Sequence, residues 1–371
     1  MTPETNKKRV VVKIGSSSLT SLHGEISRRK LEKLVEQVVR LKDSGHEVIL
    51  VSSGAVAAGY RKLGFIKRPE SLPEKQAAAS IGQGLLMEAY SEIFLSHGYV
   101  ASQILITKND FSDENRYNNV RNTLNVLLDR GIVPIINEND TVTVNRLKFG
   151  DNDTLSAKVA GLINSDLLVI LSDIDGLYDA NPMKYPDAKR IKKVTEITPE
   201  IEAAAGDAGS SVGTGGMRSK LDAFNITMAS GINGFLGQAD SPNILQEVVN
   251  GSASGTYFEP NSSAYCLSQK MQWIAFNSGP EGDLVIGNKK KEDIINNGSS
   301  LHPSEVLEVR GEFDKGSVVR IIDSEETEIG LGIVNYASDE FQQITEEDGA
   351  CEEAIDNETF VCQLDVKIPV C

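Results

Sequence analysis

Asparagine and acidic residues crowd into one stretch of the chain, Pro134 to Ala160, where side chains of these types could do chemistry. Seven of them surround a predicted strand end and helix start: Asn137, Glu138, Asn139, Asp140, Asp151, Asn152 and Asp153. Amides and carboxylates gathered at a strand end can orient a small polar ligand or hold cationic groups. The competing interpretation is that Asn and Asp mark turns and helix caps, as they commonly do.

Apolar strands alternate with amphipathic helices over the first 230 residues. We predict strands at 9–14, 47–51, 100–106, 132–136 and 167–171, and helices at about 27–44, 75–97, 117–130, after 152, and from 217 to about 230. Alternation of this kind indicates an α/β fold whose mainly parallel sheet is covered by helices on both faces, a three-layer sandwich.

Small or polar loops follow the predicted strands. They are Gly15 to Ser18, Ser52 to Gly54, Asn137 to Asp140 and Ser172 to Gly176, and a fifth, Gly213 to Gly216, precedes a helix. Ligands of parallel sheets bind at the carboxyl ends of the strands, where helix N-termini attract anions. Several such loops therefore suit a ligand with many phosphate oxygens. The chain has neither GxxxxGK[ST] nor a GxGxxG after its first strand, which excludes a P-loop and a dinucleotide fingerprint.

Two lysines adjoin these loops and could neutralise phosphate charge. Lys13 interrupts the apolar strand VVVKIG, and Lys220 closes the loop GTGGMRSK. An ordinary surface lysine is the alternative for each. That alternative is weaker for Lys13, because a charge inside an apolar strand is costly without an anionic partner.

The motifs of the chain resemble a known family. VVKIGSS, VSSGAVAAG, KQAAASIGQ, IINEND, FGDND, SDIDGLYDANP and GTGGMRSK, in this order, resemble the amino acid kinase family and, within it, the glutamate 5-kinases. The likeness runs from about Arg9 to Tyr257; after Trp273 the chain is more weakly similar to the small β-rich PUA domain. The resemblance implies transfer of the ATP γ-phosphoryl group to the side-chain carboxylate of L-glutamate. The product would be L-glutamyl 5-phosphate, the first intermediate of proline biosynthesis.

The resemblance also implies a role for each site residue. Lys13 and Lys220 would stabilise the transferred group, and Asp153 would orient both lysines. Asp153 would not act as a base, since a carboxylate nucleophile has no proton to lose. The expected substrate-binding residues are Ser53, Asn137, Asp140 and Asn152. The expected nucleotide-binding residues are Lys13, Ser172, Asp173, Thr214, Gly215, Gly216, Met217, Arg218, Ser219 and Lys220. Mg²⁺ would bridge the phosphates and keep much of its water, with no dedicated protein ligands.

The net charge of −16 on 371 residues is concentrated near the C-terminus. From Trp273 onward there are 7 Lys and Arg against 22 Asp and Glu, whereas the preceding residues have 30 against 31. We predict a kinase domain at 1–260, a linker at 261–272 and a PUA-like domain with an acidic tail at 273–371. Such an acidic domain would repel a phosphate backbone, so we do not expect nucleic acid as a partner.

Composition favours a cytoplasmic protein, with neither a signal peptide nor an apolar segment of membrane-spanning length. The four cysteines and four histidines match no metal-binding spacing. The resemblance further implies feedback inhibition by proline, a homo-oligomer and a downstream glutamyl phosphate reductase. The stretch between Thr141 and Lys148 is a candidate for a loop that closes over glutamate or responds to an inhibitor. Two alternatives stay open: another amino acid kinase, with acetylglutamate or aspartate as acceptor, or a metabolite-sensing regulator that binds RNA.

Overall fold

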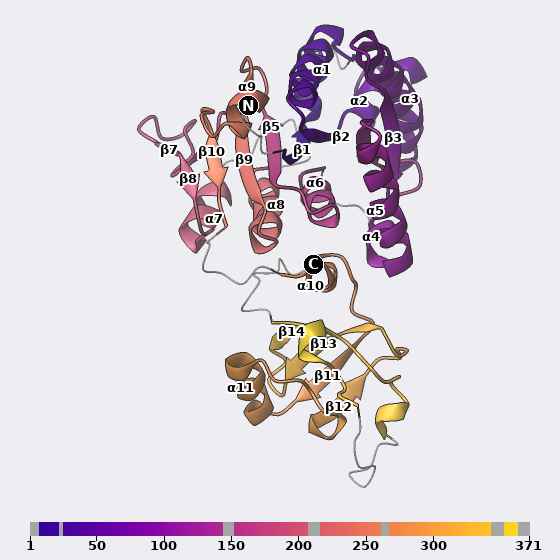
Figure 1. The fold of residues 1–371 in the computed structure, drawn as a ribbon, viewed down its shortest axis with the longest axis vertical. Helices are drawn as coiled ribbons and strands as arrows, with labels where there is room; N and C mark the ends of the chain where they lie inside the picture. The colour runs from indigo at the N-terminus through magenta and orange to yellow at the C-terminus, as the bar shows by residue number, and fades with distance from the viewer. Residues whose placement is uncertain are drawn as a thin grey trace, which may run out of the picture. The chain divides into compact units, whose positions relative to one another are not determined.

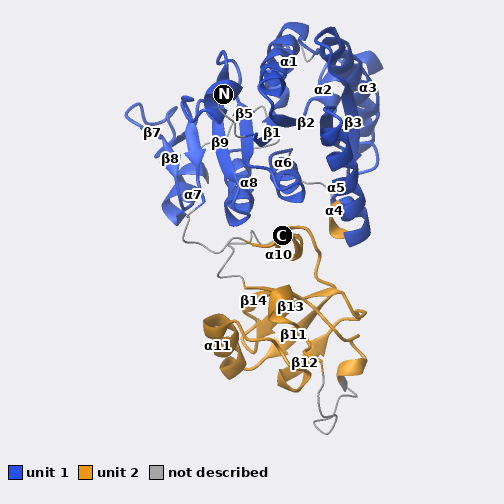
Figure 2. Ribbon diagram, viewed as in Figure 1, with its two compact units in different colours: residues 1–110, 114–264 blue, residues 111–113, 265–371 orange. Residues whose placement is uncertain are grey.

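The computed structural model describes residues 7–21, 25–143, 152–206, 216–260, 267–342 and 352–362. The chain divides into two compact units (Figures 1 and 2). Unit 1 consists of Met1–Asp110 and Glu114–Ala264, and unit 2 of Phe111–Asp113 and Tyr265–Cys371.

Within the described residues, unit 1 is built on an eight-stranded sheet with the order β3-β4-β2-β1-β5-β9-β10-β8. The strands are β1 (Arg9–Ile14), β2 (Glu47–Ser52), β3 (Ala101–Ile106), β4 (Val133–Glu138), β5 (Leu167–Ser172), β8 (Lys193–Val194), β9 (Asn233–Gln238) and β10 (Thr256–Phe258). From β3 to β9 all neighbours are parallel, and only β10 pairs antiparallel, with β9. A separate antiparallel pair joins β6 (Leu177–Tyr178) to β7 (Arg190–Ile191).

Helices cover both faces of this sheet. The helices described between β1 and β10 are α1 (Arg28–Asp43), α2 (Ala55–Gly59), α3 (Leu72–Ser96), α4 (Lys108–Ser112), α5 (Glu114–Asp129), α6 (Asn152–Leu162), α7 (Pro199–Gly206), α8 (Met217–Ala229) and α9 (Ile244–Val249), with short 3₁₀ turns at Ser16–Ser18 and Tyr60–Leu63. α1, α3 and α9 share one hydrophobic cluster with the sheet, whereas α6 and α8 pack together against β1, β5 and β9. The predicted mainly parallel sheet covered on both faces is confirmed.

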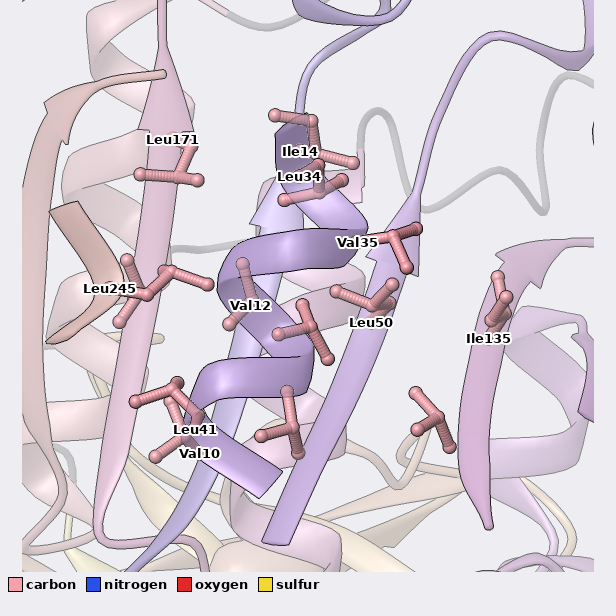
Figure 3. Close-up of a cluster of buried hydrophobic side chains, with 14 of the residues drawn as sticks. Val10, Val12, Ile14, Leu34, Val35, Leu41, Leu50, Ile135, Leu171 and Leu245 are labelled. Carbon is pink, nitrogen blue, oxygen red and sulfur yellow. The ribbon is translucent and has the colours of Figure 1, made fainter. Parts of the chain in front are cut away.

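The side chains of the central strand β1 lie alternately on opposite faces of the sheet. Val10, Val12 and Ile14 lie in the cluster under α1 and α9, together with Leu245 and other apolar residues (Figure 3). Successive side chains of a strand point to opposite faces. Lys13 therefore points to the other face, where α6 and α8 lie.

Three strands extend further than the sequence predicts. β4 continues through Asn137 and Glu138, which we expected in a loop, and both side chains are buried. β2 likewise includes Ser52, and β5 includes Ser172. The polar residues stay in β4 because its pairing with β3 continues to Glu138 and because the Asn137 side chain forms hydrogen bonds with Gln83 and Asn152. Among the helices, α3 begins at Leu72 and α5 at Glu114, each three residues earlier than predicted.

Unit 2 is rich in strands, as its sequence predicts. A five-stranded sheet in the described residues has the order β12-β11-β13-β14-β15. Its elements are β11 (Gly282–Ile286), β12 (Val306–Arg310), β13 (Val318–Asp323), β14 (Glu328–Ile333), β15 (Phe360–Cys362), α10 (Gln269–Phe276) and α11 (Asn288–Asn297), with 3₁₀ turns at Pro303–Glu305, Glu340–Gln342 and Asn357–Thr359. The final strand β15 pairs antiparallel with β14 and contains Cys362, whose side chain is buried. The other three cysteines, Cys266, Cys351 and Cys371, lie outside the described residues.

The helices described in this structure include none with the combined length and apolarity that crossing a bilayer requires.

Two glycines let α2 and α3 pack backbone to backbone. A Cβ on Gly82 would lie 1.8 Å from the carbonyl oxygen of Ala55 and 2.6 Å from the amide nitrogen of Gly59. A Cβ on Gly59 would in turn lie 1.9 Å from the carbonyl oxygen of Ala78. Backbone atoms cannot rotate away, so any larger residue must push the helices apart.

We expect Gly82→Ala to destabilise unit 1 by roughly 1–3 kcal/mol, the usual cost of overpacking. Denaturant unfolding measures this loss. Gly84→Ala is the matched control, because it lies in the same helix with nothing within 4 Å of its Cβ position. This control should gain up to about 1 kcal/mol from the higher helix propensity of alanine. Equal stability of the two variants would mean that α2 and α3 do not pack this closely.

Candidate active site

Three charged side chains meet on the face of the sheet that α6 and α8 cover. Lys13 from β1 forms an ion pair with Oδ1 of Asp153. Nζ of Lys220, from the first turn of α8, lies 3.1 Å from Oδ2 of the same carboxylate. The side chain of Asp153 is fully buried, and those of Lys13 and Lys220 are only 8% and 7% exposed. The structure thus brings together the three residues that the sequence predicts to be catalytic.

The two lysines keep Asp153 ionised despite its burial. Burial alone would raise the pKa of the Asp153 carboxyl. The charge of Lys13, then that of Lys220, and the hydrogen bonds from both ammonium groups outweigh this effect, so the pKa lies below its ordinary value. Two ammonium groups and one carboxylate leave one net positive charge at the centre of the site.

Two helix N-termini lie at this cluster. Asn152 and Asp153 open α6, and Met217 opens α8 after the extended residue Gly216. The Ser219 hydroxyl is 3.2 Å from Oδ2 of Asp153 and 2.9 Å from the carbonyl oxygen of Gly216. Asp153 is well placed at the positive end of α6, whereas Lys220 adds positive charge to the start of α8. Together the N-termini and lysines form a setting that favours a polyanion.

A second cluster consists of uncharged polar groups and surrounds Asn152. The Asn152 amide Nδ2 lies 2.9 Å from each of three acceptors: the Ser52 carbonyl oxygen, the Ser53 hydroxyl and Oδ1 of Asn137. The Ser53 loop is braced in turn by the buried Tyr90, whose hydroxyl is 3.0 Å from the Ser52 hydroxyl. The carboxyl ends of β2 and β4 and the start of α6 therefore present one connected polar surface beside Asp153.

One member of this cluster is absent from the residues predicted by sequence reasoning. Gln83 of α3 is only 8% exposed, and its Oε1 accepts a hydrogen bond of 2.9 Å from Nδ2 of Asn137. Gln83 closes the motif KQAAASIGQ, which contributed to the family resemblance. The sequence signal that could have identified Gln83 is a glutamine at the end of a helix segment of mostly small and apolar residues.

The remaining predicted residues are distributed along the same edge of the sheet. Asp140 lies half-buried in the turn that follows β4. The Ser172 hydroxyl, at the end of β5, donates to Oδ1 of the exposed Asp173 at 2.9 Å. The Arg218 side chain is exposed at the start of α8. Thr214 and Gly215, as well as Asp151 and the segment 144–148 of the expected closing loop, lie outside the described residues.

The described residues do not form a protein-only magnesium site. No group of three or more His, Cys, Asp or Glu side chains among them could hold a metal ion. Each carboxylate oxygen of Asp153 faces an ammonium group instead of an open position. Any magnesium ion at this site would therefore have to be held mainly by ligands other than these side chains.

The fold agrees with comparisons to known proteins. Residues 8–237 match the amino acid kinase family, and residues 282–352 match the PUA domain. This chain belongs to the amino acid kinase family. Carbamate kinase from Giardia lamblia bound to AMP-PNP has the same fold over 69% of this chain and 100% of its own, with a TM-score of 0.50 at 18% identity.

Relatives of known name match nearly the whole chain. Glutamate 5-kinase 2 of Bacillus licheniformis is 70% identical over 371 residues, which cover 99% of this chain and 100% of the relative. Glutamate 5-kinase 2 of Bacillus subtilis is also 70% identical over 371 residues, covering all of both chains. Glutamate 5-kinase of a Thermoanaerobacter species is 46% identical over 336 residues, covering 91% of this chain and 90% of the relative.

We expect Asp153→Asn to lower the free energy of unfolding by about 3–5 kcal/mol, because it leaves two buried ammonium groups without their counter-ion. The folded-state pKa lies below the ordinary value of 3.8. The carboxylate therefore stabilises the fold fully above that pH and loses its effect as the pH falls through the lower folded pKa.

Denaturant unfolding of the wild type and Asp153→Asn between pH 8 and pH 4 tests this expectation. The difference should be constant from pH 8 to pH 5 and should narrow only near pH 4. Glu92→Gln, which breaks an ion pair with Arg28 between two exposed side chains, is the control and should change little. A difference that already changes between pH 8 and pH 5 would show that Asp153 titrates in that range.

Proposed function

We propose that this protein transfers the γ-phosphoryl group of ATP to the side-chain carboxylate of L-glutamate, forming L-glutamyl 5-phosphate, the first step of proline biosynthesis. The observation that carries the proposal is the buried cluster of Lys13, Asp153 and Lys220 at two helix N-termini, adjoined by the amide cluster around Asn152. The name shared by relatives 70% identical over the whole chain supports glutamate as the acceptor.

The chemistry asks mainly for positioning and charge stabilisation. Phosphoryl transfer passes through a loose transition state whose charge is spread over the equatorial oxygens. Lys13 and Lys220 would bind those oxygens from two sides, and Asp153 would hold both ammonium groups in place. No general base is needed, because the attacking carboxylate is already ionised at neutral pH.

Each of the two polar regions would bind one of the two substrates. Ser53, Asn137, Asp140 and Asn152 would bind glutamate. Ser172, Asp173 and the segment from Thr214 to Lys220 would bind ATP together with Lys13. We further propose that Mg²⁺ reaches the site on the ATP phosphates and retains most of its water ligands, in line with its preference for phosphate and water oxygens.

The family resemblance supports several wider proposals. We infer a kinase domain at residues 1–260, a linker at 261–272 and a PUA-like domain at 273–371. Proline, the end product of the proposed pathway, would act as a feedback inhibitor. Because an acyl phosphate is labile, we also expect a partner glutamyl phosphate reductase that consumes it promptly. We expect a homo-oligomer and a cytoplasmic location.

Ion pairing in unit 2 argues against the RNA-binding alternative. Of the six lysines and arginines described between Trp273 and Cys362, five are in ion pairs with acidic residues. One example is Lys291, whose ammonium group lies 2.6 Å from the buried carboxylate of Asp323. Basic side chains that are already neutralised by neighbours attract a phosphate backbone weakly.

We expect the purified protein with ATP, Mg²⁺, glutamate and hydroxylamine to yield γ-glutamyl hydroxamate, since hydroxylamine traps the acyl phosphate. The assay should be run in parallel with aspartate, acetylglutamate and a reaction without acceptor. Only glutamate should react efficiently. Hydroxamate from aspartate or acetylglutamate but not from glutamate would assign the acceptor to another member of the family.

We expect Lys220→Ala to lower kcat by roughly 10²–10³-fold, the usual effect of removing one donor that stabilises transition-state charge. Glutamate binding, measured by titration calorimetry, should survive, because the amide cluster is separate from this lysine. Lys315→Ala serves as a control, since Lys315 pairs with Glu352 on an exposed surface of unit 2. Equal loss of turnover and glutamate binding would indicate that Lys220 is only structural.

A further inference from the structure

Gln83 carries a buried hydrogen-bond donor without an acceptor. Its side-chain Nε2 is buried and has no partner among the described residues, although its Oε1 accepts from Asn137. Gln83 lies one helical turn before Leu86, whose Cδ1 is 3.9 Å from the Cβ position of Gly54, the residue after Ser53. The unused donor therefore belongs to the part of α3 that lies over the Ser53 loop.

The neighbouring amides fix which way Gln83 is turned. Oδ1 of Asn137 accepts hydrogen bonds from Nδ2 of Asn152 and from the backbone amide of Glu138, each of 2.9 Å. Nδ2 of Asn137 must therefore be the group that donates to Gln83, and only Oε1 of Gln83 can accept. Rotating the Gln83 amide by half a turn would set two donors against each other. The series of hydrogen bonds from Asn152 through Asn137 to Gln83 therefore ends at a donor, Nε2 of Gln83.

An unpaired buried donor is costly, and native proteins rarely keep one without a reason. No described residue offers Nε2 an acceptor. The nearby oxygen Oδ1 of Asn137 already accepts hydrogen bonds from Asn152 and Glu138. A ligand that supplies an acceptor oxygen would remove this cost. A cation or a second donor would not.

We propose that Gln83 is a further substrate-binding residue, whose Nε2 donates a hydrogen bond to a carboxylate oxygen of the acceptor amino acid. This inference rests on the proposed function, since it takes glutamate as the occupant of the amide cluster. Gln83 then does two things at once. It orients Asn137, and through it Asn152, with its oxygen, and it binds the acceptor with its nitrogen.

Two substitutions separate these two roles. Gln83→Glu keeps an oxygen that can accept from Asn137 but replaces the donor by a second oxygen. Gln83→Met removes both polar atoms and keeps an unbranched side chain of similar length. If Gln83 binds a carboxylate, Gln83→Glu should be at least as harmful as Gln83→Met, because it places an acceptor and a negative charge against the ligand.

The experiment is steady-state kinetics of γ-glutamyl hydroxamate formation, with glutamate and ATP varied in turn. In both variants the KM for glutamate should rise by about tenfold or more, the loss expected for one hydrogen bond to a charged group, while the KM for ATP stays within about twofold. Glutamate should also raise the Tm of the wild type and fail to raise that of Gln83→Glu at the same concentration.

A matched control is available in the same unit. Gln37 of α1 is 9% exposed and accepts a hydrogen bond from the backbone amide of Leu245 through its Oε1. Gln37→Met removes a buried glutamine of the same kind and should leave the KM for glutamate unchanged. A comparable rise in this control would show that the effect of Gln83 substitution reflects general destabilisation, which overturns the proposal.

The remaining outcomes are distinguishable. A Gln83→Glu variant with the wild-type KM for glutamate would show that the oxygen alone matters, so that Gln83 only orients Asn137. This result overturns the inference and leaves the proposed function intact. A wild-type protein that forms no hydroxamate from glutamate would overturn the proposed function and the inference with it.

Discussion

The structure depends on one buried interaction, the carboxylate of Asp153 held between the ammonium groups of Lys13 and Lys220. Burying any of these charges alone would be prohibitive, and burying all three is tolerable only when they are in contact. That requirement fixes three elements relative to one another: the central strand β1, the start of α6 and the first turn of α8. The alternation of β1 makes this possible, since Lys13 points away from the core that Val12 and Ile14 fill.

The sequence predicts much of this arrangement because local patterns determine it. Strand β1 is at its predicted bounds, and a lysine inside an apolar strand already implies a buried anionic partner. The identity of that partner does not follow from local physics. Asp153 and Lys220 are 67 positions apart and meet only because α6 and α8 pack side by side. The family resemblance supplied this pairing, and the packing of the two helices explains it.

Sequence reasoning failed where side chains far apart in the chain satisfy one another. Polarity at Asn137 and Glu138 indicated a loop, yet β4 continues through both residues. Asn137 can be buried in a strand because Gln83, 54 positions away, accepts from its amide, and Asn152, 15 positions away, donates to it. No local period or turn signal encodes such a network. Gln83 was missed for the same reason, because nothing in the local sequence of its helix indicates that its side chain contacts Asn137.

The lysine–carboxylate cluster and the amide cluster differ in charge, and this difference suits a reaction between two anions. Carboxyl phosphorylation brings two anions, an acceptor carboxylate and a nucleotide phosphate, into contact, and their repulsion must be offset before any bond forms. On the proposed assignment, the phosphate would meet the full charges that Asp153 keeps in place, and the acceptor would meet neutral amides. Oδ1 of Asn137 and Oε1 of Gln83 are already engaged within the amide cluster, so Nε2 of Gln83 would remain for the ligand. Neutral donors orient a carboxylate without neutralising its nucleophilic oxygen, which is the property this reaction needs.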